Sequence, residues 1–409
     1  MKKIKTYILL LLIVSCSVND DLQFDDLQFD DPVNIPIYSA TELIIQFKEN
    51  VPLRKKVALR AEFGVISSDP CHCTDDAIEK WTFENDVDIE NKKKLLDPDE
   101  SGDIEEIKNV DYEFSFESEK IDFSTIKFPK FLNYQSVIST NNYGVTIAVL
   151  DTGLNVNYAG FSGQYLYNAN NCNCETISGL PNQISGWDYV NEDNNTYDDH
   201  YSVHGTKVAY IMHRKMIADN IPHQILPLKI ADNFGKISAF NLICGTKNAV
   251  QFADIVNMSL GYYSNGEDDK SKILEDIIIN NNHVLFVTSA GNSNRDTEIF
   301  THYPSSFPQE NVVAIAAANK TGNRKAYFSN YGMESIDFYA IGENIQIEYL
   351  TDPISGTSYS APYVSAIAAK LLFNNRMTLS PDMIIQKLDQ VGTSIEQDGE
   401  KVKYEKIIR

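Results

Sequence analysis

Long apolar runs separated by polar or glycine-containing turns dominate the second part of the chain. The runs Gly144–Leu150 and Val284–Ala290 are almost uninterrupted, which is typical of strands that helices cover on both faces of a parallel sheet. Pro362–Phe373 carries small and apolar residues nearly all the way round, which predicts a buried helix. Its proline is expected near the helix start, where a missing N–H costs little. The pattern predicts an α/β fold with a mostly parallel central sheet.

Residues 41–116 mix strand and helix periods and predict a small α+β domain ahead of that sheet. The predicted elements are a strand and then an amphipathic helix ending at Gly64 within residues 41–65, strands at Ile78–Phe83 and Val110–Phe116, and a charged loop at Glu84–Glu106. Residues 117–140 are polar and charged without a clear period, so they are expected to form a linker.

Residues 1–15 have the layout of an export signal. Lys2, Lys3 and Lys5 precede the apolar run Tyr7–Val14, which is too short to span a bilayer. The run ends in the letters LIVSC, with Cys16 last. This ending resembles the bacterial lipobox, whose cysteine is lipidated and becomes N-terminal after cleavage. The alternative is an ordinary secretory signal with a chance cysteine. The acidic repeat that follows is expected to be a flexible tether.

The composition narrows the possible partners. A formal net charge of −22 disfavours nucleic acid, because its phosphates would be repelled. With 409 residues and 43% hydrophobic content, the chain is long enough to bury a large core. No segment after the signal is long and apolar enough to predict a transmembrane helix, so the expected membrane contact is the lipid on Cys16.

Three side chains of complementary chemistry lie at the ends of predicted elements. Asp151 follows Gly144–Leu150, at the carboxyl end of a strand, where α/β sheets carry their sites. His204 opens a predicted helix and suits a general base. Ser358 lies at the mouth of the buried helix, where unpaired N–H groups and the positive dipole end favour an oxyanion. Asp-Thr-Gly also occurs in aspartic proteases, but the second copy they need is absent, so that interpretation requires a homodimer.

The blocks Asp-Thr-Gly, His-Gly-Thr and Gly-Thr-Ser-x-x-x-Pro stand in this order and resemble the subtilase family of serine peptidases over about residues 140–409. The resemblance implies a three-layer, subtilisin-like fold. It also implies that Asp151 orients His204, that His204 takes the proton of Ser358, and that Ser358 is acylated by the peptide carbonyl. Asn292 matches the family's oxyanion-hole asparagine.

The same resemblance implies a cleft in which an extended peptide pairs with the edge of a strand. The residues expected to bind substrate are Ser259, Leu260, Gly261, Ser289, Ala290, Gly291 and His302. His302 falls near the floor of the family's specificity pocket, where it would narrow the pocket or favour an acidic or polar side chain.

The chain departs from the family at several positions. Lys207 and Tyr210 stand where the family has a second histidine and often a glycine, and Tyr359 and Ser360 replace Met-Ala after the nucleophile. None of these is a triad position, but Tyr359 adds bulk close to Ser358. The family's common calcium loop after the histidine helix is absent, so no cofactor is expected and no strong calcium site is expected there.

The remaining cysteines are Cys71, Cys73, Cys172, Cys174 and Cys244. In an exported protein they are expected to form disulfides. One possibility is that the first Cys-x-Cys pair bridges to the second and ties the N-terminal domain to the catalytic domain. A zinc site that uses both Cys-x-Cys pairs together with His72 is the alternative, although it lacks the usual two-residue spacing.

The expected organisation is a signal peptide (1–15), an acidic tether (16–40), a propeptide-like α+β domain (41–116), a processing linker (117–140) and a catalytic domain (141–409). The predicted function is a self-processed serine endopeptidase acting on proteins or peptides. Its own pro-segment would inhibit it, and the lipid on Cys16 would anchor it to the bacterial membrane, at the outer membrane or cell surface. Two alternatives are a permanent accessory domain in place of the propeptide, and a catalytically silent scaffold that binds peptides. The presence of the whole triad and of Asn292 argues against the silent scaffold.

Overall fold

A computed structural model describes residues 34–72, 77–102, 104–117, 144–156, 163–167, 186–264, 266, 270–348, 350–395 and 400–409. The predicted signal peptide, Cys16 and nearly all of the predicted linker lie outside these residues. None of the helices within them has the length and hydropathy that crossing a bilayer requires.

A nine-stranded sheet forms the centre of the catalytic domain. Its order is β15 (Thr393–Ser394), β16 (Lys406–Ile408), β14 (Phe338–Ile341), β13 (Val312–Ala318), β11 (Leu285–Ser289), β9 (Ile255–Met258), β5 (Val145–Asp151), β7 (His223–Lys229) and β6 (Trp187–Asp188). Every neighbouring pair is parallel except β15 with β16. The predicted parallel α/β fold is therefore confirmed.

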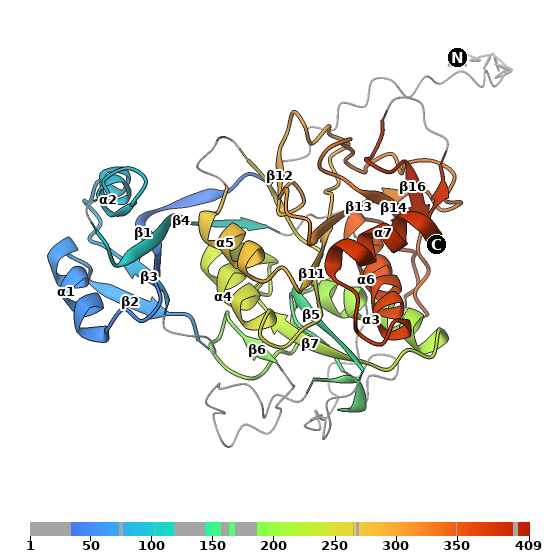
Figure 1. The fold of residues 1–409 in the computed structure, drawn as a ribbon, viewed down its shortest axis with the longest axis horizontal. Coiled ribbons are helices and arrows are strands. Elements are labelled where there is room, and N and C mark those ends of the chain that lie inside the picture. Colours follow the sequence, from blue (N-terminus) through green and yellow to red (C-terminus); the bar gives the residue numbers. More distant parts are fainter. Residues whose placement is uncertain are drawn as a thin grey trace, which may run out of the picture. The chain divides into compact units, whose positions relative to one another are not determined.

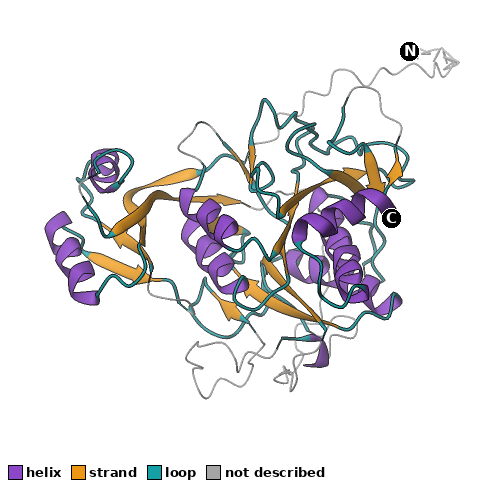
Figure 2. Cartoon of the chain, in the orientation of Figure 1, coloured by secondary structure: helices purple, strands orange, loops and turns teal. Residues whose placement is uncertain are grey.

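Helices cover both faces of this sheet. They are α3 (His204–Ala218), α4 (Ala239–Ala249), α5 (Lys272–Asn280), α6 (Thr357–Asn374) and α7 (Pro381–Val391). Along β5, Ile147 and Val149 share a core cluster with α3, α6 and α7, whereas Ala148 and Leu150 share one with α4 and α5. This alternation follows from the two-residue period of a strand. Figure 1 shows the two groups of helices on opposite sides of the strands, and Figure 2 shows the resulting three layers.

The helix that carries Ser358 begins earlier than the sequence suggested. α6 begins at Thr357, so Pro362 lies inside it and not at its first turn. Its missing N–H would have bonded the carbonyl of Ser358, four residues back, so the expectation of a harmless first-turn position was wrong.

The N-terminal domain has its own sheet. It contains β1 (Ile37–Phe47), α1 (Leu53–Phe63), β2 (Ser67–Pro70), β3 (Ile78–Thr82), α2 (Ile89–Leu96) and β4 (Ile107–Glu117). The sheet order is β2-β3-β1-β4-β8, so β8 (Lys236–Ser238) of the catalytic domain completes it. As predicted, α1 ends at Gly64, whose left-handed backbone (φ 73°) caps the helix.

Two expectations for this domain were wrong. The stretch Glu84–Glu106, predicted as a loop, contains α2, which Asp88 caps by accepting a hydrogen bond from the Asn91 backbone N–H at 3.1 Å. β1 begins at Ile37, inside the range predicted as a tether. The remaining elements are η1 (Gly163–Tyr165) and the antiparallel pair β10 (Tyr262–Tyr263) and β12 (His302–Tyr303).

Candidate active site

The candidate active site lies where parallel strands end and two helices begin. β5 ends at Asp151, α3 begins at His204, and Ser358 is the second residue of α6. Ser259–Gly261 follow β9, and Ser289 is the last residue of β11. Carboxyl ends of parallel strands meet at one edge of a sheet, which is where α/β folds place their ligands.

Asp151 and His204 form a buried pair. The Asp151 Oδ1 and His204 Nδ1 atoms are 2.8 Å apart, and Oδ1 also accepts the Thr152 backbone N–H at 2.8 Å. The Thr152 hydroxyl oxygen accepts the Gly205 N–H at 2.9 Å, which joins the strand end to the helix start. A side chain at Gly205 would meet the Gly153 carbonyl oxygen at 2.4 Å. This close approach therefore requires glycine.

Two opposing effects set the protonation of His204. Burial disfavours the charged imidazolium, but the Asp151 carboxylate outweighs it, so the pKa of His204 lies above its ordinary 6.5. The Asp151 bond leaves the other ring nitrogen, Nε2, as the one able to accept a proton. A buried histidine held by a carboxylate in this way has the geometry of a general base.

Ser358 is fixed through its own carbonyl group. Pro362 has no N–H to bond that carbonyl, and the Ser259 hydroxyl donates to it instead at 2.8 Å. The Ser259 hydroxyl in turn accepts from the Asn257 side-chain amide at 2.9 Å. The Ser358 hydroxyl donates to the Ser259 carbonyl at 3.2 Å, so its proton is directed there and not toward His204 in this structure. The hydrogen bond between a nucleophile and its general base often forms with good geometry only when substrate binds.

Asn292 lies beside the start of α6. Its Oδ1 accepts the Thr357 backbone N–H at 2.8 Å and the Thr357 hydroxyl at 3.0 Å. The Thr357 hydroxyl oxygen also accepts the Gly291 N–H at 3.1 Å. Because the carbonyl end of the Asn292 amide is anchored, its NH2 end faces away from Thr357. This arrangement suits a donor to a developing oxyanion next to Ser358.

The predicted substrate residues form two adjacent segments. Ser259–Gly261 and Ser289–Gly291 continue neighbouring parallel strands, and the Ser289 hydroxyl donates to the Leu260 carbonyl at 3.4 Å. His302 lies between the two segments. A methyl group on Gly261 would meet its Cε1 at 2.2 Å, and one on Gly291 would meet its Nε2 at 3.0 Å. The structure therefore brings all seven predicted substrate residues to one place.

His302 is fully buried, and burial lowers its pKa to about 3. Its Nδ1 lies 2.8 Å from the Ser305 hydroxyl, and its ring packs edge-on against Tyr263 with centroids 5.0 Å apart. A neutral ring supplies no positive charge near neutral pH. The ring therefore contributes bulk and not charge to the space between Gly261 and Gly291.

Asp198 was not found by sequence reasoning. Its buried carboxylate accepts the backbone N–H and hydroxyl of Thr206 at 2.9 and 2.6 Å, and the His200 N–H at 3.3 Å. Burial raises its pKa, and the nearby Asp151 carboxylate raises it further, while Thr206 acts in the opposite sense. Asp198 thus holds the first turn of the helix that carries His204. The only sequence signal was an acidic loop before that helix.

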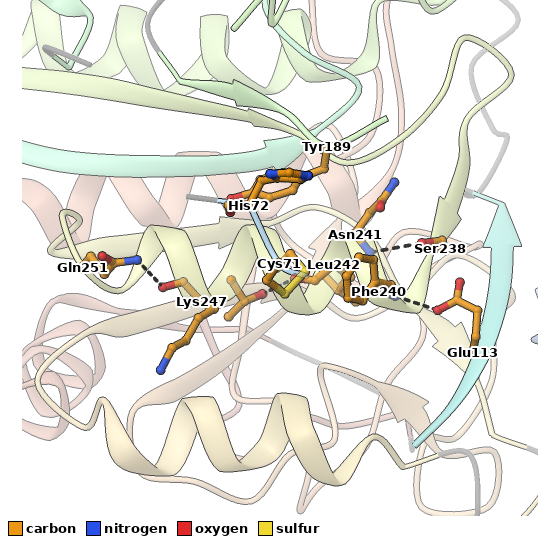
Figure 3. Close-up of a disulfide and its surroundings, with 12 residues drawn as sticks. Cys71, His72, Glu113, Tyr189, Ser238, Phe240, Asn241, Leu242, Lys247 and Gln251 are labelled. Atoms are coloured by element: carbon orange, nitrogen blue, oxygen red, sulfur yellow. Dashed lines mark hydrogen bonds between the residues drawn. A yellow bond between two sulfur atoms is a disulfide. The ribbon is translucent and has the colours of Figure 1, made fainter. Parts of the chain in front are cut away.

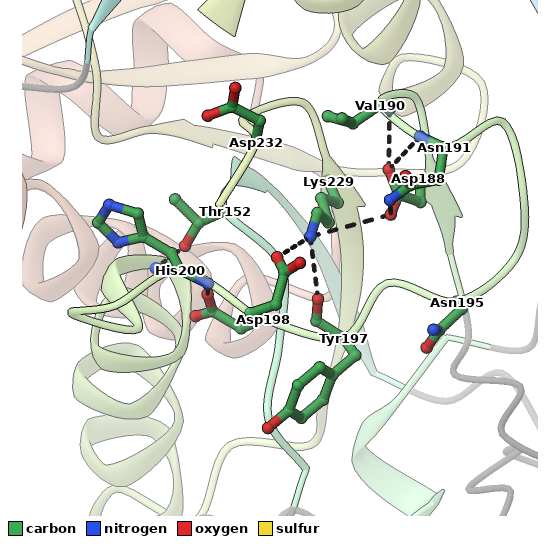
Figure 4. Close-up of polar contacts among 12 residues, drawn as sticks. Thr152, Asp188, Val190, Asn191, Asn195, Tyr197, Asp198, His200, Lys229 and Asp232 are labelled. Carbon is green, nitrogen blue, oxygen red and sulfur yellow. Dashed lines mark hydrogen bonds and ion pairs between the residues drawn. The ribbon is translucent and has the colours of Figure 1, made fainter. Parts of the chain in front are cut away.

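Lys229 was also missed. Its side chain is 2% exposed, and its ammonium group bonds the Asp199 carboxylate and donates to the Tyr197 carbonyl at 3.2 Å. The Asp188 carboxylate lies 3.9 Å away on the other side (Figure 4). In the sheet, Lys229 is the register partner of both Asp188 and Asp151. One buried cation therefore ties the loop that contains Asp198 to the central sheet.

The family departures pack around the histidine. Tyr359 is buried, with its ring centroid 5.6 Å from that of His204, so its bulk lies against the base. Lys207 is buried, and its charge opposes the protonation of His204. Tyr210 donates to Glu348 at 3.5 Å, on a later turn of α3. The connection from α3 to β7 covers only residues 219–222. That no strong calcium site lies at this connection stays a prediction.

The disulfide differs from the proposed connectivity. Cys71 of the N-terminal domain is bonded to Cys244 in α4, with their Cα atoms 5.3 Å apart (Figure 3). The expected tether between the domains is present, but its partner is not Cys172 or Cys174. A disulfide sulfur is no zinc ligand, so the alternative zinc site is contradicted at Cys71. Cys73, Cys172 and Cys174 lie outside the described residues.

The fold and the site together define a class: an α/β protein with a nucleophile candidate at a helix N-terminus and a carboxylate-held histidine at the same sheet edge. Comparison with known proteins gives the family. Residues 142–393 match the model of the subtilase family, Peptidase S8. The chain therefore belongs to the subtilase family, and it is a subtilisin-like serine endopeptidase.

Individual relatives agree with this assignment. A thermophilic serine proteinase of Bacillus sp. (strain AK1) is 26% identical over 388 residues, covering 90% of this chain and 86% of the relative. A subtilisin-like protease of Coccidioides posadasii (strain C735) is 29% identical over 246 residues, and the match spans only 53% of its length. The crystal structure of a cold adapted subtilisin-like serine proteinase aligns with a TM-score of 0.52 and 25% identity, covering 70% of this chain and 94% of that one.

Proposed function

We propose that the chain cleaves peptide bonds through Asp151, His204 and Ser358, with Asn292 stabilising the oxyanion. The observation that carries this proposal is the buried 2.8 Å contact between Asp151 Oδ1 and His204 Nδ1, at the same sheet edge as Ser358. A carboxylate in that position fixes the tautomer and the orientation of the ring.

The reaction follows from these groups. The Ser358 hydroxyl attacks the peptide carbonyl while His204 Nε2 takes its proton, and the carbonyl oxygen becomes an oxyanion. The Asn292 NH2 group and the Ser358 backbone N–H donate to that oxygen. Collapse of the intermediate expels the amine, which takes the proton from His204, and leaves an acyl ester on Ser358. Water then hydrolyses the ester with His204 again acting as base, which releases the carboxylate product.

Substrate binding would use the two strand ends. An extended peptide pairing with Ser259–Gly261 gains main-chain hydrogen bonds that do not depend on its sequence, and a pocket beside this segment selects one side chain. The neutral ring of His302 narrows that pocket between Gly261 and Gly291. We therefore expect a preference for small or polar side chains at the cleaved position, without a charge-based preference for acidic ones.

The N-terminal domain would act as the enzyme's own inhibitor, and the enzyme itself would cut the linker that follows the domain. Asn34 supports this role, since its side-chain amide donates to the Gly261 carbonyl at 2.7 Å and its own carbonyl accepts the Tyr263 N–H at 2.9 Å. The domain thus occupies the Gly261 carbonyl, a hydrogen-bonding group of the predicted substrate strand. Export and lipid anchoring through Cys16 complete the proposal, on the strength of the lipobox-like sequence.

The test is intact mass of a soluble form beginning after Cys16, treated while folded with or without a fluorophosphonate and then denatured and reduced so that the Cys71–Cys244 disulfide no longer joins cut chains, beside the Ser358→Ala variant. Loss of the segment before about residue 141 and gain of one phosphonyl group are expected in the parent protein. Neither change is expected in the variant. Labelling without loss of mass would reject self-processing, and absence of labelling in a folded protein would reject catalysis by Ser358.

A further inference from the structure

We propose that the N-terminal domain, residues 34–117, remains bound to the catalytic domain as a permanent second chain after the linker is cut. The inference rests on the self-processing proposed above, because it concerns the state that follows cleavage. The Cys71–Cys244 disulfide carries it. A cut anywhere within residues 118–143 places these two cysteines on different chains, and the disulfide then joins them.

The disulfide between the N-terminal domain and α4 is buried. Both cysteines are buried and share one core cluster with residues of β5 and of α5. Cys244 lies in the middle of α4, among its buried residues, and Cys71 follows β2 (Figure 3). A buried disulfide is shielded from attacking thiolates, since exchange requires access to a sulfur atom. The link is therefore protected while the two domains stay folded.

The N-terminal sheet is built to be covered on both faces. Leu43, Ile45 and Phe47 pack in the cluster that includes α1 and α2. Ile44, on the opposite face, shares the cluster of α4 and α5 with Phe114. The two-residue strand period thus divides β1 between the domain's own core and the catalytic domain. If the domain left, this second apolar face would be exposed to water.

The sheet itself continues across the boundary. Ser115, Phe116 and Glu117 of β4 pair with β8, which lies just before α4 in the catalytic domain. Next to this pairing, the ring of Tyr262 packs 5.0 Å from those of Phe114 and Phe116. Departure of the domain would leave a new unpaired strand edge on each side.

Two carboxylates of β4 cap the two helices beneath the sheet. Asp111 accepts the Ser271 hydroxyl at 2.6 Å and the backbone N–H groups of Lys272 and Ile273 at 3.0 Å each. Glu113 accepts the Phe240 N–H at the start of α4, at 3.0 Å. Helix starts carry unpaired N–H groups and a partial positive charge, so both carboxylates supply what α4 and α5 need. These contacts fix the domain's orientation and keep the disulfide buried.

The retained chain would also border the cleft. Asn34 of the same domain bonds both Glu117 and Gly261, so the two ends of the domain meet beside the predicted substrate strand. The mature enzyme is therefore a two-chain protein in which the N-terminal chain forms part of the surface next to the substrate.

The test is denaturing electrophoresis and intact mass of the matured full chain, with free thiols alkylated first, with and without dithiothreitol. Dithiothreitol reduces the disulfide to two cysteine thiols and is itself oxidised to its cyclic disulfide. We expect one species without reductant, whose mass is the sum of both chains, and two species with it. Separate chains without reductant, or recovery of the catalytic chain alone, would overturn the proposal.

A single uncut chain under both conditions would reject self-processing instead. Whether the N-terminal domain is retained is then tested with the uncut Ser358→Ala protein. Brief trypsin treatment cuts it at the lysines of residues 118–143, and the fragments are separated by the same electrophoresis. Linked fragments support retention, and separate fragments overturn it. The two proposals thus fail by different results.

Cys244→Ala is the matched variant, and its thermal unfolding should remain cooperative. Its two chains are expected to separate on a denaturing gel without reductant. After dilution and gel filtration, it should lose the N-terminal chain that the parent protein keeps in a 1:1 ratio, because a covalent tether holds the effective local concentration on the order of millimolar. Linked chains in Cys244→Ala would assign the connection to another cysteine pair and overturn this one.

Discussion

The two sides of the active site are built from different chemistry. The groups that hold the nucleophile side are neutral hydroxyls and amides, from Asn257, Ser259, Asn292 and Thr357. On the side of the base, the buried groups are charged. They are Asp151, Asp198, Lys207 and Lys229, with Asp188 and Asp199 as partners of Lys229.

The neutral groups on the nucleophile side set the geometry of the site, and the charged groups on the side of the base set the protonation of His204. Directional hydrogen bonds between neutral groups position the Ser358 carbonyl and the Asn292 amide, and none of these groups titrates near neutral pH. Buried charges on the other side determine when His204 can accept a proton. Changes on the neutral side should therefore lower turnover at every pH, whereas changes on the charged side should also alter the pH dependence or the stability.

The largest expected effect is on the charged side. Asp151→Asn should lower kcat/KM by about 10⁴-fold, because the amide favours the wrong tautomer of His204, as the same change does in another serine protease triad. Peptide hydrolysis measured across pH checks this. Asp254→Asn is the control, since that carboxylate accepts the Thr146 N–H at 2.8 Å at the other end of β5. Equal losses in both variants would contradict the assigned role of Asp151.

On the neutral side, Asn292→Ala should lower kcat by about 10²- to 10³-fold with little change in KM, because the oxyanion loses one donor. The shape of the pH profile should not change. Single-turnover kinetics with a peptide ester measures the loss, and Asn323→Ala, at an exposed asparagine, is the control. A loss expressed mainly in KM would mean that Asn292 binds substrate and does not stabilise the transition state.

Lys229→Met tests the buried cation. Removing it leaves the carboxylate of Asp188 buried without a counter-charge, which should lower the free energy of unfolding by about 3 kcal/mol. Because the loop then holds Asp198 less firmly, kcat should fall more than KM rises. Urea unfolding and peptide kinetics measure both effects. Lys229→Arg keeps the charge and should recover part of each loss. Unchanged stability of the Met variant would contradict the role of Lys229 as the buried cation that ties the loop to the sheet.

The smallest expected effect is a shift in the pH at which kcat/KM falls to half its maximum. The pKa of His204 is raised, and the base works only when neutral, so kcat/KM should fall about tenfold per pH unit as the pH drops through that pKa. The midpoint should lie above the ordinary 6.5 of histidine. A pH series of kcat/KM gives the midpoint directly, and a midpoint below 6.5 would contradict the balance in which Asp151 outweighs burial.

The sequence by itself determined the fold class and brought forward the principal site residues. Uninterrupted apolar runs predict parallel strands, and Asp151 and Ser289 follow or end such runs, so their place at one sheet edge could be predicted from local pattern alone. His204 and Ser358 carry short motifs at helix starts, which are likewise local signals.

Only the tertiary structure decided the rest, because the partners are far apart in the chain. Cys71 and Cys244 are separated by 173 residues, and nothing in their spacing selects this pair. Lys229 gave no signal, since a lysine ending an apolar strand is ordinary until loop carboxylates close around it. The helix α2 was hidden by its charged composition, and its burial against β1 and β4 stabilises it in the folded chain. Local pattern specifies elements and their ends; packing between distant segments specifies which charges and sulfur atoms meet.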